Sequence, residues 1–428
     1  MKSFEELALT PMLATAMARD GFAVPTPIQA EAIPLALSGH DIMGLAQTGT
    51  GKTLAFGIPL LNEVLQKPGK PAPKTVKALI LAPTRELVNQ IAQTLKSLTQ
   101  QTKVRVTTVV GGASIGKQLQ LLSRGSDVLV ATPGRLIDLL ERDGVDLSTT
   151  QHLVLDEADQ MLDIGFIHAL RKIVPFLSDN RQTLLFSATM SRPMEQLSRA
   201  YLTDPKKVQV NPPNLTADKV EQSVRFVEKP RKPAELRNVL NQHPGVPTLV
   251  FARTKHGAER LKKGLVADGF AATSVHGNKT QGQRDRAIKQ FRSGEMQILV
   301  ATDVAARGID IPTVGLVINY ELANVPENYV HRIGRTARAG RSGVAVTFCA
   351  SDESKLLREV EKLIKTDIRV EGDAPKSKSN TGLDTQKTKT TKPKRRWHRD
   401  KPKGHQPGNQ PPSAKPRRRK PRPQKNAA

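Results

Sequence analysis

Short apolar segments alternate with helix-length segments along most of the chain, and this alternation limits the fold more than any other feature. Such segments occur at 41–46, 78–83, 105–111, 127–133, 152–156 and 183–189, and again at 248–252, 272–277, 297–303, 315–320 and 344–350. Continuous apolar strands separated by helices are typical of parallel sheets that are covered on both faces. We therefore predict an α/β fold in which two domains each contain a parallel sheet flanked by helices.

The domain boundaries follow from length and from one break in the pattern. A chain of 428 residues is too long for a single ordinary core. Residues 204–222, "DPKKVQVNPPNLTADKVEQ", are rich in proline and poor in apolar side chains, which is typical of a linker. We predict a first domain at 1–205, a linker at 206–221, a second domain at 222–366 and a tail at 367–428.

The charge of the chain is positive and unevenly distributed. The net charge is +26, and residues 370–428 contribute +14 of it, with 18 Lys or Arg against 4 Asp or Glu. Such a balance favours a polyanionic partner, of which nucleic acid fits best. The tail has almost no residues that could form a core, so we predict that it is disordered and tethers RNA, with Trp397 stacking on a base. The alternative is a tail that only keeps the protein in solution.

Other bulk features indicate the compartment. Cys349 is the only cysteine, so no intrachain disulfide can form, which fits a reducing compartment. No apolar run approaches the ~20 residues of a membrane span, and the start of the chain lacks the apolar region of a signal peptide. We expect a cytoplasmic monomer with no membrane partner.

The segment "AQTGTGKT" follows the first predicted strand and precedes a helix. It is close to the phosphate-loop pattern G-x-x-x-x-G-K-[ST], with Ala46 at the position of the first glycine. Gly49 and Gly51 allow backbone N–H groups to point at phosphates, Lys52 can reach the β- and γ-phosphates, and the Thr53 hydroxyl can bind Mg²⁺. The alternative is an ordinary glycine-rich turn. The predicted nucleotide-binding residues here are Ala46, Gln47, Thr48, Gly49, Thr50, Gly51, Lys52 and Thr53.

Three acidic residues, Asp156, Glu157 and Asp159, follow the strand at 152–156. Carboxylates this close repel one another and are costly to bury unless a cation lies opposite. Because ligands of α/β proteins bind at the carboxyl ends of the strands, Asp156 is placed to bind Mg²⁺ directly or through water. Glu157 would then orient or deprotonate the attacking water. The alternative is a helix N-terminus that carries acidic residues for its dipole.

With these two motifs, residues 1–366 resemble the DEAD-box ATP-dependent RNA helicases, and the short N-terminus and basic tail are most similar to the bacterial RhlE-type branch. The resemblance implies two tandem RecA-like domains that use ATP and Mg²⁺. Besides "DEAD" at 156–159, the ordered motifs are "GFAVPTPIQ" (21–29), "PTREL" (83–87), "GG" (111–112), "TPGR" (132–135), "SAT" (187–189), "LVFART" (249–254), "ATDVAARGIDI" (301–311) and "HRIGRTARAG" (331–340).

The resemblance implies further residues of the ATP site. In segment 3–29, Gln29 is expected to read adenine with its amide and Phe4 to stack on or pack near the base. Arg335 and Arg338 are expected to act as arginine fingers on the γ-phosphate, with Ala337 at a position where the family often has glycine. Gly308 and Asp310 are expected near the nucleotide. The residues expected to couple the two sites are Asp159, Ser187, Thr189 and His331, with Ser187 and Thr189 hydrogen-bonded to Asp159.

The resemblance also implies an RNA surface and a function. The expected RNA-binding residues are Pro83, Thr84, Arg85, Gly112, Thr132, Arg135, Arg253, Thr302 and Asp303. Such side chains position a strand through phosphate and sugar without reading its sequence. The expected activity is ATP-dependent local unwinding of short RNA duplexes or remodelling of RNA–protein complexes, in ribosome biogenesis, RNA degradation or cold adaptation. The alternatives are an RNA annealer that acts through its tail and a DNA-directed translocase.

Overall fold

The computed structural model describes residues 1–46, 49–67, 69–210, 220–306, 314–337 and 342–372. These residues form two seven-stranded sheets that follow one another along the chain. We use "first domain" for the elements up to β7 and "second domain" for those from β8 onward. Nearly all of the predicted tail lies outside the described residues.

The first domain contains a parallel sheet with the strand order β3-β4-β2-β5-β6-β1-β7. Its strands are β1 (Ile42–Leu45), β2 (Val76–Leu81), β3 (Val106–Val109), β4 (Ser126–Ala131), β5 (His152–Leu155), β6 (Gln182–Ser187) and β7 (Lys206–Gln209). Its helices are η1 (Phe4–Glu6), α1 (Pro11–Arg19), α2 (Pro27–Leu37), α3 (Lys52–Gln66), α4 (Arg85–Leu98), α5 (Ile115–Leu122), α6 (Pro133–Leu140), α7 (Ala158–Asp163), α8 (Ile167–Ile173), η2 (Val174–Phe176) and α9 (Arg192–Tyr201).

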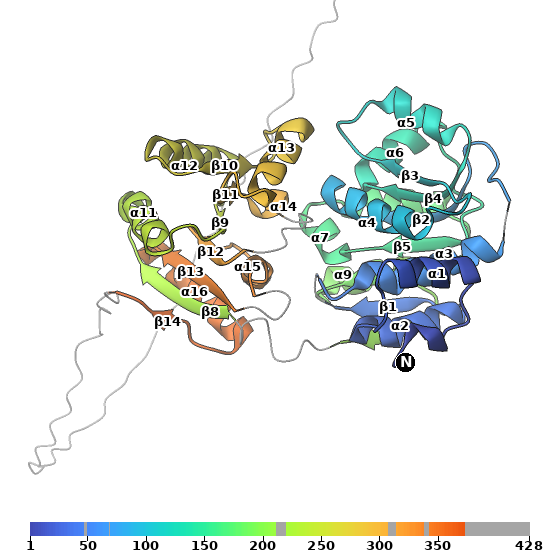
Figure 1. Ribbon diagram of the computed structural model, residues 1–428, viewed down its shortest axis with the longest axis horizontal. Helices are drawn as coiled ribbons and strands as arrows, with labels where there is room; N and C mark the ends of the chain where they lie inside the picture. Colours follow the sequence, from blue (N-terminus) through green and yellow to red (C-terminus); the bar gives the residue numbers. More distant parts are fainter. Residues whose placement is uncertain (47–48, 68, 211–219, 307–313, 338–341, 373–428) are drawn as a thin grey trace, which may run out of the picture. The chain divides into compact units, whose positions relative to one another are not determined.

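Helices cover both faces of this sheet (Figure 1). Successive side chains of a strand point to opposite faces, so Ala78 and Ile80 belong to one buried cluster while Leu79 and Leu81 belong to another. The first cluster packs against α1 to α4, and the second against α5 to α9. This double cover explains why the strands are continuously apolar in sequence.

The second domain repeats the arrangement with the strand order β10-β11-β9-β12-β13-β8-β14, again parallel. Its strands are β8 (Val220–Phe226), β9 (Thr248–Phe251), β10 (Ala272–Val275), β11 (Ile298–Ala301), β12 (Leu316–Asn319), β13 (Gly343–Cys349) and β14 (Arg369–Val370). Its helices are η3 (Lys229–Arg231), α11 (Lys232–Gln242), α12 (Lys255–Ala267), α13 (Gln281–Arg292), α14 (Asp303–Ala306), α15 (Pro326–Ile333), η4 (Ser351–Glu353) and α16 (Ser354–Ile364).

Every strand predicted from the apolar segments is present, but three strands were missed. β7 and β8 lie at the two ends of the segment expected to be a linker, and β14 lies beyond the expected end of the second domain. The linker boundaries were therefore wrong at both ends. Only Val208 is buried among Lys206–Gln209, which form an edge strand, so these residues lack the apolar run that marks the central strands.

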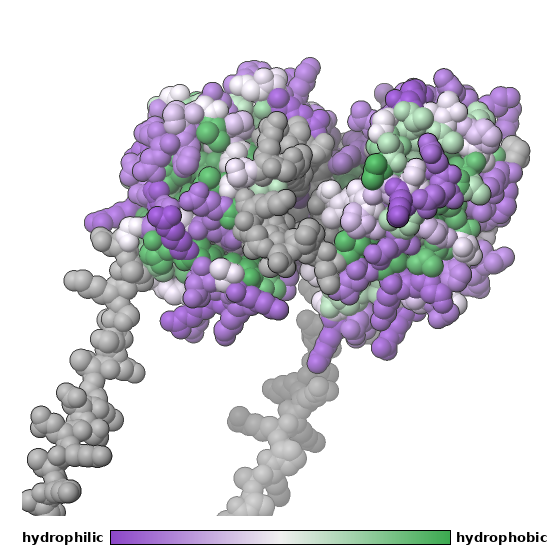
Figure 2. Space-filling view, turned by 60° about the horizontal axis from the view of Figure 1, so that its bottom comes forward, coloured by the Kyte–Doolittle hydropathy of each residue, from purple (hydrophilic) through white to green (hydrophobic). Residues whose placement is uncertain are grey.

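The surface is predominantly hydrophilic, with smaller hydrophobic areas, on the face that Figure 2 shows. Among the residues that the structure describes, no helix has both the length and the apolar character needed to cross a bilayer. The strand order decides where functional residues can meet. Because all strands of a sheet are parallel, their carboxyl ends lie on one edge, and ligands of α/β proteins bind at that edge.

Candidate functional site

The phosphate-loop segment joins β1 to α3 at the carboxyl edge of the first sheet. Gly51 precedes α3 with φ of 93°, a left-handed conformation that favours glycine. A Cβ on Gly51 would also collide with the Gln29 side-chain amide, so a side chain here would displace that amide. Backbone N–H groups at the start of a helix attract anions, and this loop offers them to a phosphate.

Lys52 and Asp156 form the buried centre of the site. Lys52 is 6% exposed and Asp156 2%, and Lys52 Nζ lies 3.8 Å from Asp156 Oδ1. Within the described part of the chain, Lys52 Nζ has no hydrogen-bond acceptor. Burial raises the pKa of Asp156 to about 6, although Lys52 opposes the shift. A buried cation without an acceptor is costly, and a phosphate oxygen would satisfy it.

The same residues fit a magnesium ion. Mg²⁺ prefers a few carboxylate and hydroxyl oxygens together with water and substrate phosphates, rather than a cage made only of protein groups. Asp156 supplies a buried carboxylate whose charge is partly offset by Lys52 and by the backbone N–H of Glu157, and Thr53 supplies a hydroxyl at the start of α3. No group of three or more His, Cys, Asp or Glu that could hold a metal occurs among the described residues. The donor set therefore suits a metal that is shared with a phosphate.

Glu157 and Asp159 connect the acidic segment to the next strand. Glu157 has φ of 52° and ψ of 49°, a strained left-handed conformation for a residue that is not glycine, and such strain is common at functional sites. Asp159 Oδ2 accepts hydrogen bonds from Thr189 N at 3.0 Å and from Thr189 Oγ1 at 3.2 Å. Ser187 differs from our expectation, because its hydroxyl donates to the Thr189 carbonyl at 2.7 Å rather than to Asp159.

Gln29 lies between the start of α2 and the phosphate loop. Its Oε1 accepts from Thr26 N at 2.9 Å, and its Nε2 donates to the Gly51 carbonyl at 2.9 Å. A side-chain amide has a second hydrogen and a second lone pair, so the predicted contact with adenine stays possible. Phe4 is 7% exposed and packs in the first-domain core, and its stacking on or packing near the base stays a prediction.

The predicted RNA-binding residues of the first domain lie at the carboxyl ends of β2, β3 and β4. Thr84 accepts from Leu87 N at 3.2 Å and caps α4, and Thr132 precedes α6. Arg135 Nη1 donates to the Ala113 carbonyl at 3.0 Å. Gly112 has φ of 71°, and a Cβ there would collide with the Arg85 guanidinium. Pro83, Thr84, Arg85, Thr132 and Arg135 line one pocket.

In the second domain, the buried Arg332 connects three segments at the carboxyl edge of the sheet. Its Nε and Nη2 pair with the two carboxylate oxygens of Asp303, at 2.5 and 2.8 Å. Its Nη1 donates to Asn319 Oδ1 at 3.1 Å and to the Glu321 carbonyl at 2.7 Å. Both oxygens of Asp303 are thus bonded to Arg332, and the expected place of Asp303 at or beside the RNA surface stays a prediction.

The remaining predicted residues divide into two groups. His331 lies on α15, and Arg335, which is 4% exposed, follows that helix; Thr302 precedes α14. The other group falls outside the described residues and consists of Gln47, Thr48, Gly308, Asp310 and Arg338.

Sequence reasoning missed a buried ionic cluster beside Arg253. Lys232 Nζ lies 2.7 Å from Glu353 Oε2, and Arg253 Nη2 lies 2.6 Å from Glu353 Oε1. Lys232 and Glu353 are 2% and 3% exposed and stand 121 positions apart in the chain. A pair so distant in sequence has no local pattern, and no signal in the sequence marks it.

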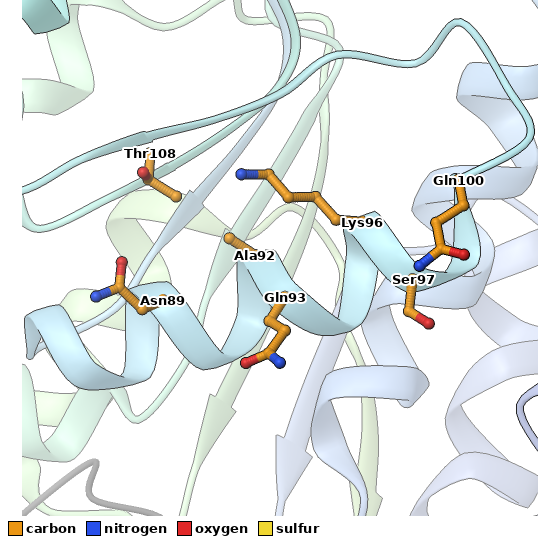
Figure 3. Close-up of a pocket in the computed structure, with 7 residues that line it drawn as sticks. All are labelled: Asn89, Ala92, Gln93, Lys96, Ser97, Gln100 and Thr108. Carbon is orange, nitrogen blue, oxygen red and sulfur yellow. The ribbon is translucent and has the colours of Figure 1, made fainter. Parts of the chain in front are cut away.

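A separate pocket on the outer side of α4 contains none of the predicted residues (Figure 3). Its cavity volume is about 420 Å³, and Lys96 is its only charged residue. All of its lining residues except Thr108 belong to α4 or follow it closely, and all except Ala92 are polar. This pocket lacks the buried charges that mark the phosphate-loop site.

Two parallel sheets in tandem, a phosphate loop and a buried acidic strand end define a two-domain protein of the phosphate-loop nucleotide-binding class. The profile of the family described as DEAD/DEAH box helicase matches residues 26–197, and that of the helicase conserved C-terminal domain matches residues 231–340. The chain belongs to the DEAD-box helicase family.

Curated relatives agree with this assignment. The chain is 44% identical over 367 residues to DEAD-box ATP-dependent RNA helicase 30 of Arabidopsis thaliana, covering 85% of this chain but only 62% of that protein's length. It is 40% identical over 363 residues to DEAD-box ATP-dependent RNA helicase CshA of Bacillus subtilis, covering 85% and 72%. It is 44% identical over 361 residues to ATP-dependent rRNA helicase rrp3 of Aspergillus terreus, covering 84% and 80%.

Solved structures match the fold over most of the chain. Dbp5 of S. cerevisiae, bound to RNA and ADP BeF3, aligns with a TM-score of 0.76 and 31% identity, covering 86% of this chain and 95% of that one. Mss116p, bound to ssRNA and AMP-PNP, aligns with a TM-score of 0.77 and 32% identity, covering 87% and 79%. The similarity therefore spans both domains.

Proposed function

We propose that this chain is an ATP-dependent RNA helicase that separates short RNA duplexes locally or remodels RNA–protein complexes. The names of its relatives support this activity, and so do the nucleotide and RNA in the two solved structures. In this proposal ATP and single-stranded RNA both favour closure of the two domains, so each ligand strengthens binding of the other.

One observation carries the proposal, namely the order of functional segments along the edge of the first sheet. The strands β3, β4 and β2 end in the predicted RNA-binding residues, whereas β5, β6 and β1 end in the acidic segment, Thr189 and the phosphate loop. β5 and β6 are neighbours, and the hydrogen bonds between Asp159 and Thr189 join them. A change at the phosphates would thus reach the RNA end of the edge through adjacent strands.

The chemistry follows from the side chains at the ATP end. Lys52 donates to the β- and γ-phosphates, and Asp156 with Thr53 would hold Mg²⁺, which would neutralise phosphate charge. Glu157 orients a water molecule and accepts its proton while the water oxygen bonds to the γ-phosphorus and the bond to the bridging oxygen breaks. Arg335 and Arg338 stabilise the charge that develops on the transferred group.

Loss of the γ-phosphate contacts after hydrolysis lets the domains separate and releases the RNA. In this scheme, binding of ATP drives strand separation, and hydrolysis resets the protein.

Finer features of the proposal concern the tail and the cell. The basic residues beyond 370 are proposed to tether RNA, and their composition is the ground on which we propose the RhlE-type branch. A relative named as an rRNA helicase supports a role in ribosome biogenesis over RNA degradation. We propose accordingly that the protein is a cytoplasmic monomer that acts with ribosome-assembly proteins.

Glu157→Gln tests the proposal directly. The amide cannot accept the proton, so RNA-stimulated ATP hydrolysis should fall by about 10²–10⁴-fold. RNA binding in the presence of ATP should persist, because the variant keeps the phosphate contacts. Asp163→Asn, which alters an acid at the end of α7, is the matched control and should hydrolyse ATP normally. Unchanged hydrolysis by Glu157→Gln would refute the base assignment.

Truncation after residue 372 tests the tail. RNA affinity should fall and depend less on salt concentration, while ATP hydrolysis at saturating RNA stays the same. Equal affinity and an equal salt slope in the truncated chain would mean that the tail only keeps the protein in solution.

A further inference from the structure

The Glu353 carboxylate lies at the centre of a buried network in the second domain and has two cationic partners. Its Oε1 faces Arg253 Nη2 at 2.6 Å, and its Oε2 accepts from Lys232 Nζ at 2.7 Å. The backbone N–H of Ala350 also donates to Oε2, at 3.1 Å. With 3% of Glu353 exposed, the carboxylate cannot rotate freely, so it determines where the Arg253 guanidinium lies.

Lys232 fixes the other side of this network. Besides Glu353, its Nζ donates to the Tyr320 carbonyl at 3.0 Å and to the Phe348 carbonyl at 3.3 Å. The ammonium group has three hydrogens, so these three acceptors satisfy it. The network therefore ties α11, β12 and β13 to the carboxylate and makes it a rigid support.

Arg253 is held at two points while part of it faces solvent. Its backbone N–H donates to Glu321 Oε2 at 2.7 Å, and its Nη2 donates to Glu353 and, at 3.4 Å, to the Leu322 carbonyl. The side chain is 33% exposed, and within the described residues no hydrogen bond is formed by Nε or Nη1. One edge of the guanidinium is thus anchored, and the other can bind a phosphate.

We propose that Glu353 is a positioning residue for RNA binding, which acts by holding the Arg253 guanidinium in the orientation that binds an RNA phosphate. This inference rests on the proposed function, because it needs Arg253 to contact RNA. A fixed guanidinium loses less rotamer freedom when RNA binds, so the contact is stronger than one from a mobile arginine.

The direction in which RNA affinity changes when the Glu353 charge is removed distinguishes a positioning role from a purely electrostatic one. A carboxylate near bound phosphates repels them, so its removal should strengthen RNA binding if charge alone matters. Positioning predicts the opposite. In Glu353→Gln only one carbonyl oxygen remains, and the more deeply buried Lys232 should take it, which releases Arg253.

The experiment measures binding of single-stranded oligouridine to the full chain with AMP-PNP and Mg²⁺, across a range of salt concentrations. Glu353→Gln should bind about tenfold more weakly, with a salt slope lower by about 0.7, as expected when one phosphate contact to a single strand is lost. Arg253→Ala should show the same loss, and adding Glu353→Gln to it should cause no further loss. Asp352→Asn removes the same charge one position away, in an exposed pair with Lys229, and should bind within about twofold of wild type.

Glu353→Gln leaves Lys232 with one weaker partner, which could impair folding. A second comparison, made in the Lys232→Met variant, therefore controls for a folding defect. In Lys232→Met the carboxylate keeps Arg253, so RNA affinity should stay near the wild-type value. In Lys232→Met/Glu353→Met the buried pair is replaced by apolar side chains, which proteins often tolerate, and Arg253 is released. The double variant should bind RNA about tenfold more weakly than Lys232→Met, with AMP-PNP affinity measured without RNA unchanged.

The outcomes distinguish this inference from the proposed function. If RNA binding by the wild type does not depend on the nucleotide, the proposed function is wrong, and so is this inference. If Arg253→Ala weakens binding but both Glu353 variants bind as tightly as their parents, the inference alone is wrong. A loss from Glu353→Gln that persists in the Arg253→Ala background also overturns it, since the effect would not pass through Arg253.

Discussion

The two sheets have the same strand order, yet the charges at their carboxyl edges are arranged in opposite ways. Position by position, β1 of the first sheet corresponds to β8 of the second, and β5 corresponds to β12. At the end of β5, Asp156 faces Lys52, whose Nζ has no hydrogen-bond acceptor among the residues that the structure describes. At the end of β12, Arg332 is bonded to Asp303, to Asn319 and to a backbone carbonyl.

The connection after the corresponding strand explains the contrast. β1 leads into a glycine loop and α3, which together can surround a phosphate. β8 leads through "VEKPR" into α11, and this connection contains no glycine. The second domain therefore lacks a glycine loop at the corresponding position, and in our proposal it contributes cations such as Arg335 to the chemistry.

Whether the hydrogen bonds of a buried charge are completed within the protein distinguishes a ligand site from a supporting network. A buried charge whose hydrogen bonds are all made within the protein stabilises the fold and positions its neighbours. A buried charge that lacks acceptors is destabilising unless a ligand completes it. By this criterion Lys52 marks a ligand site, whereas Arg332 and Lys232 mark a support.

Lys52→Met should have the largest effect on activity and a small effect on folding. ATP hydrolysis should fall by about 10²–10³-fold, because a donor to the transferred phosphate is lost. The free energy of unfolding should change by less than about 1 kcal/mol, since Asp156 can take up a proton when its cation is removed. Chemical denaturation and steady-state hydrolysis of the same preparation measure both. A large loss of stability would contradict the contrast between Lys52 and Arg332, because Lys52 would then also stabilise the fold.

Arg332→Met should have the reverse profile and should destabilise the second domain by about 3 kcal/mol. Breaking a buried ion pair leaves the partner groups without their donors, and the partial exposure of Asp303 keeps the loss at the lower end of the usual range. Arg237→Met is the matched control, because its pair with Asp268 is exposed on both sides and should contribute less than about 1 kcal/mol. Equal midpoints for both variants in urea would contradict this prediction.

Residues with strong local patterns were predictable from the sequence. The phosphate loop, the acidic segment and the central strands each carry a spacing or an apolar run, and the parallel topology then places them on one edge. The relation between Asp159 and Thr189 came from the family resemblance, since nothing local links a residue of α7 to one that follows β6. Ser187 was wrong in detail because a hydroxyl can rotate toward any nearby acceptor, and the Thr189 carbonyl lies closer in the chain.

Residues whose role depends on burial were not predictable. Lys232 and Glu353 are of residue types that usually lie on the surface, and the packing of α11 against the end of β13 buries them. The family resemblance implied that Phe4 stacks on or packs near the base, but no sequence pattern predicted that the capped turn η1 would direct its ring into the core. Edge strands such as β7 and β14 were missed because half or more of their side chains are exposed.

Thr189→Val tests the hydrogen bond that links the segments after β5 and β6. The variant loses the hydroxyl bond to Asp159 but keeps the backbone one, so stability should fall by about 1 kcal/mol and stimulation of hydrolysis by RNA should weaken. Thr183→Val, on β6 itself, is the matched control. Its buried hydroxyl has no partner within the described part of the chain, so its replacement should leave stability unchanged or higher. Equal losses in both variants would show that the Asp159 bond contributes nothing.

Ala337→Gly should have the smallest effect and should stabilise the second domain. Ala337 has φ of 55°, a conformation that costs a residue with a Cβ about 1–2 kcal/mol, and glycine removes that strain. The greater freedom of glycine in the unfolded chain offsets about 0.5–1 kcal/mol of the gain, so a net stabilisation of about 0.5 kcal/mol is expected. Ala234→Gly, at an exposed position of α11, should instead destabilise by up to about 1 kcal/mol. Urea midpoints of the two variants should therefore move in opposite directions, and a destabilised Ala337→Gly would mean that contacts of the methyl group outweigh the backbone strain.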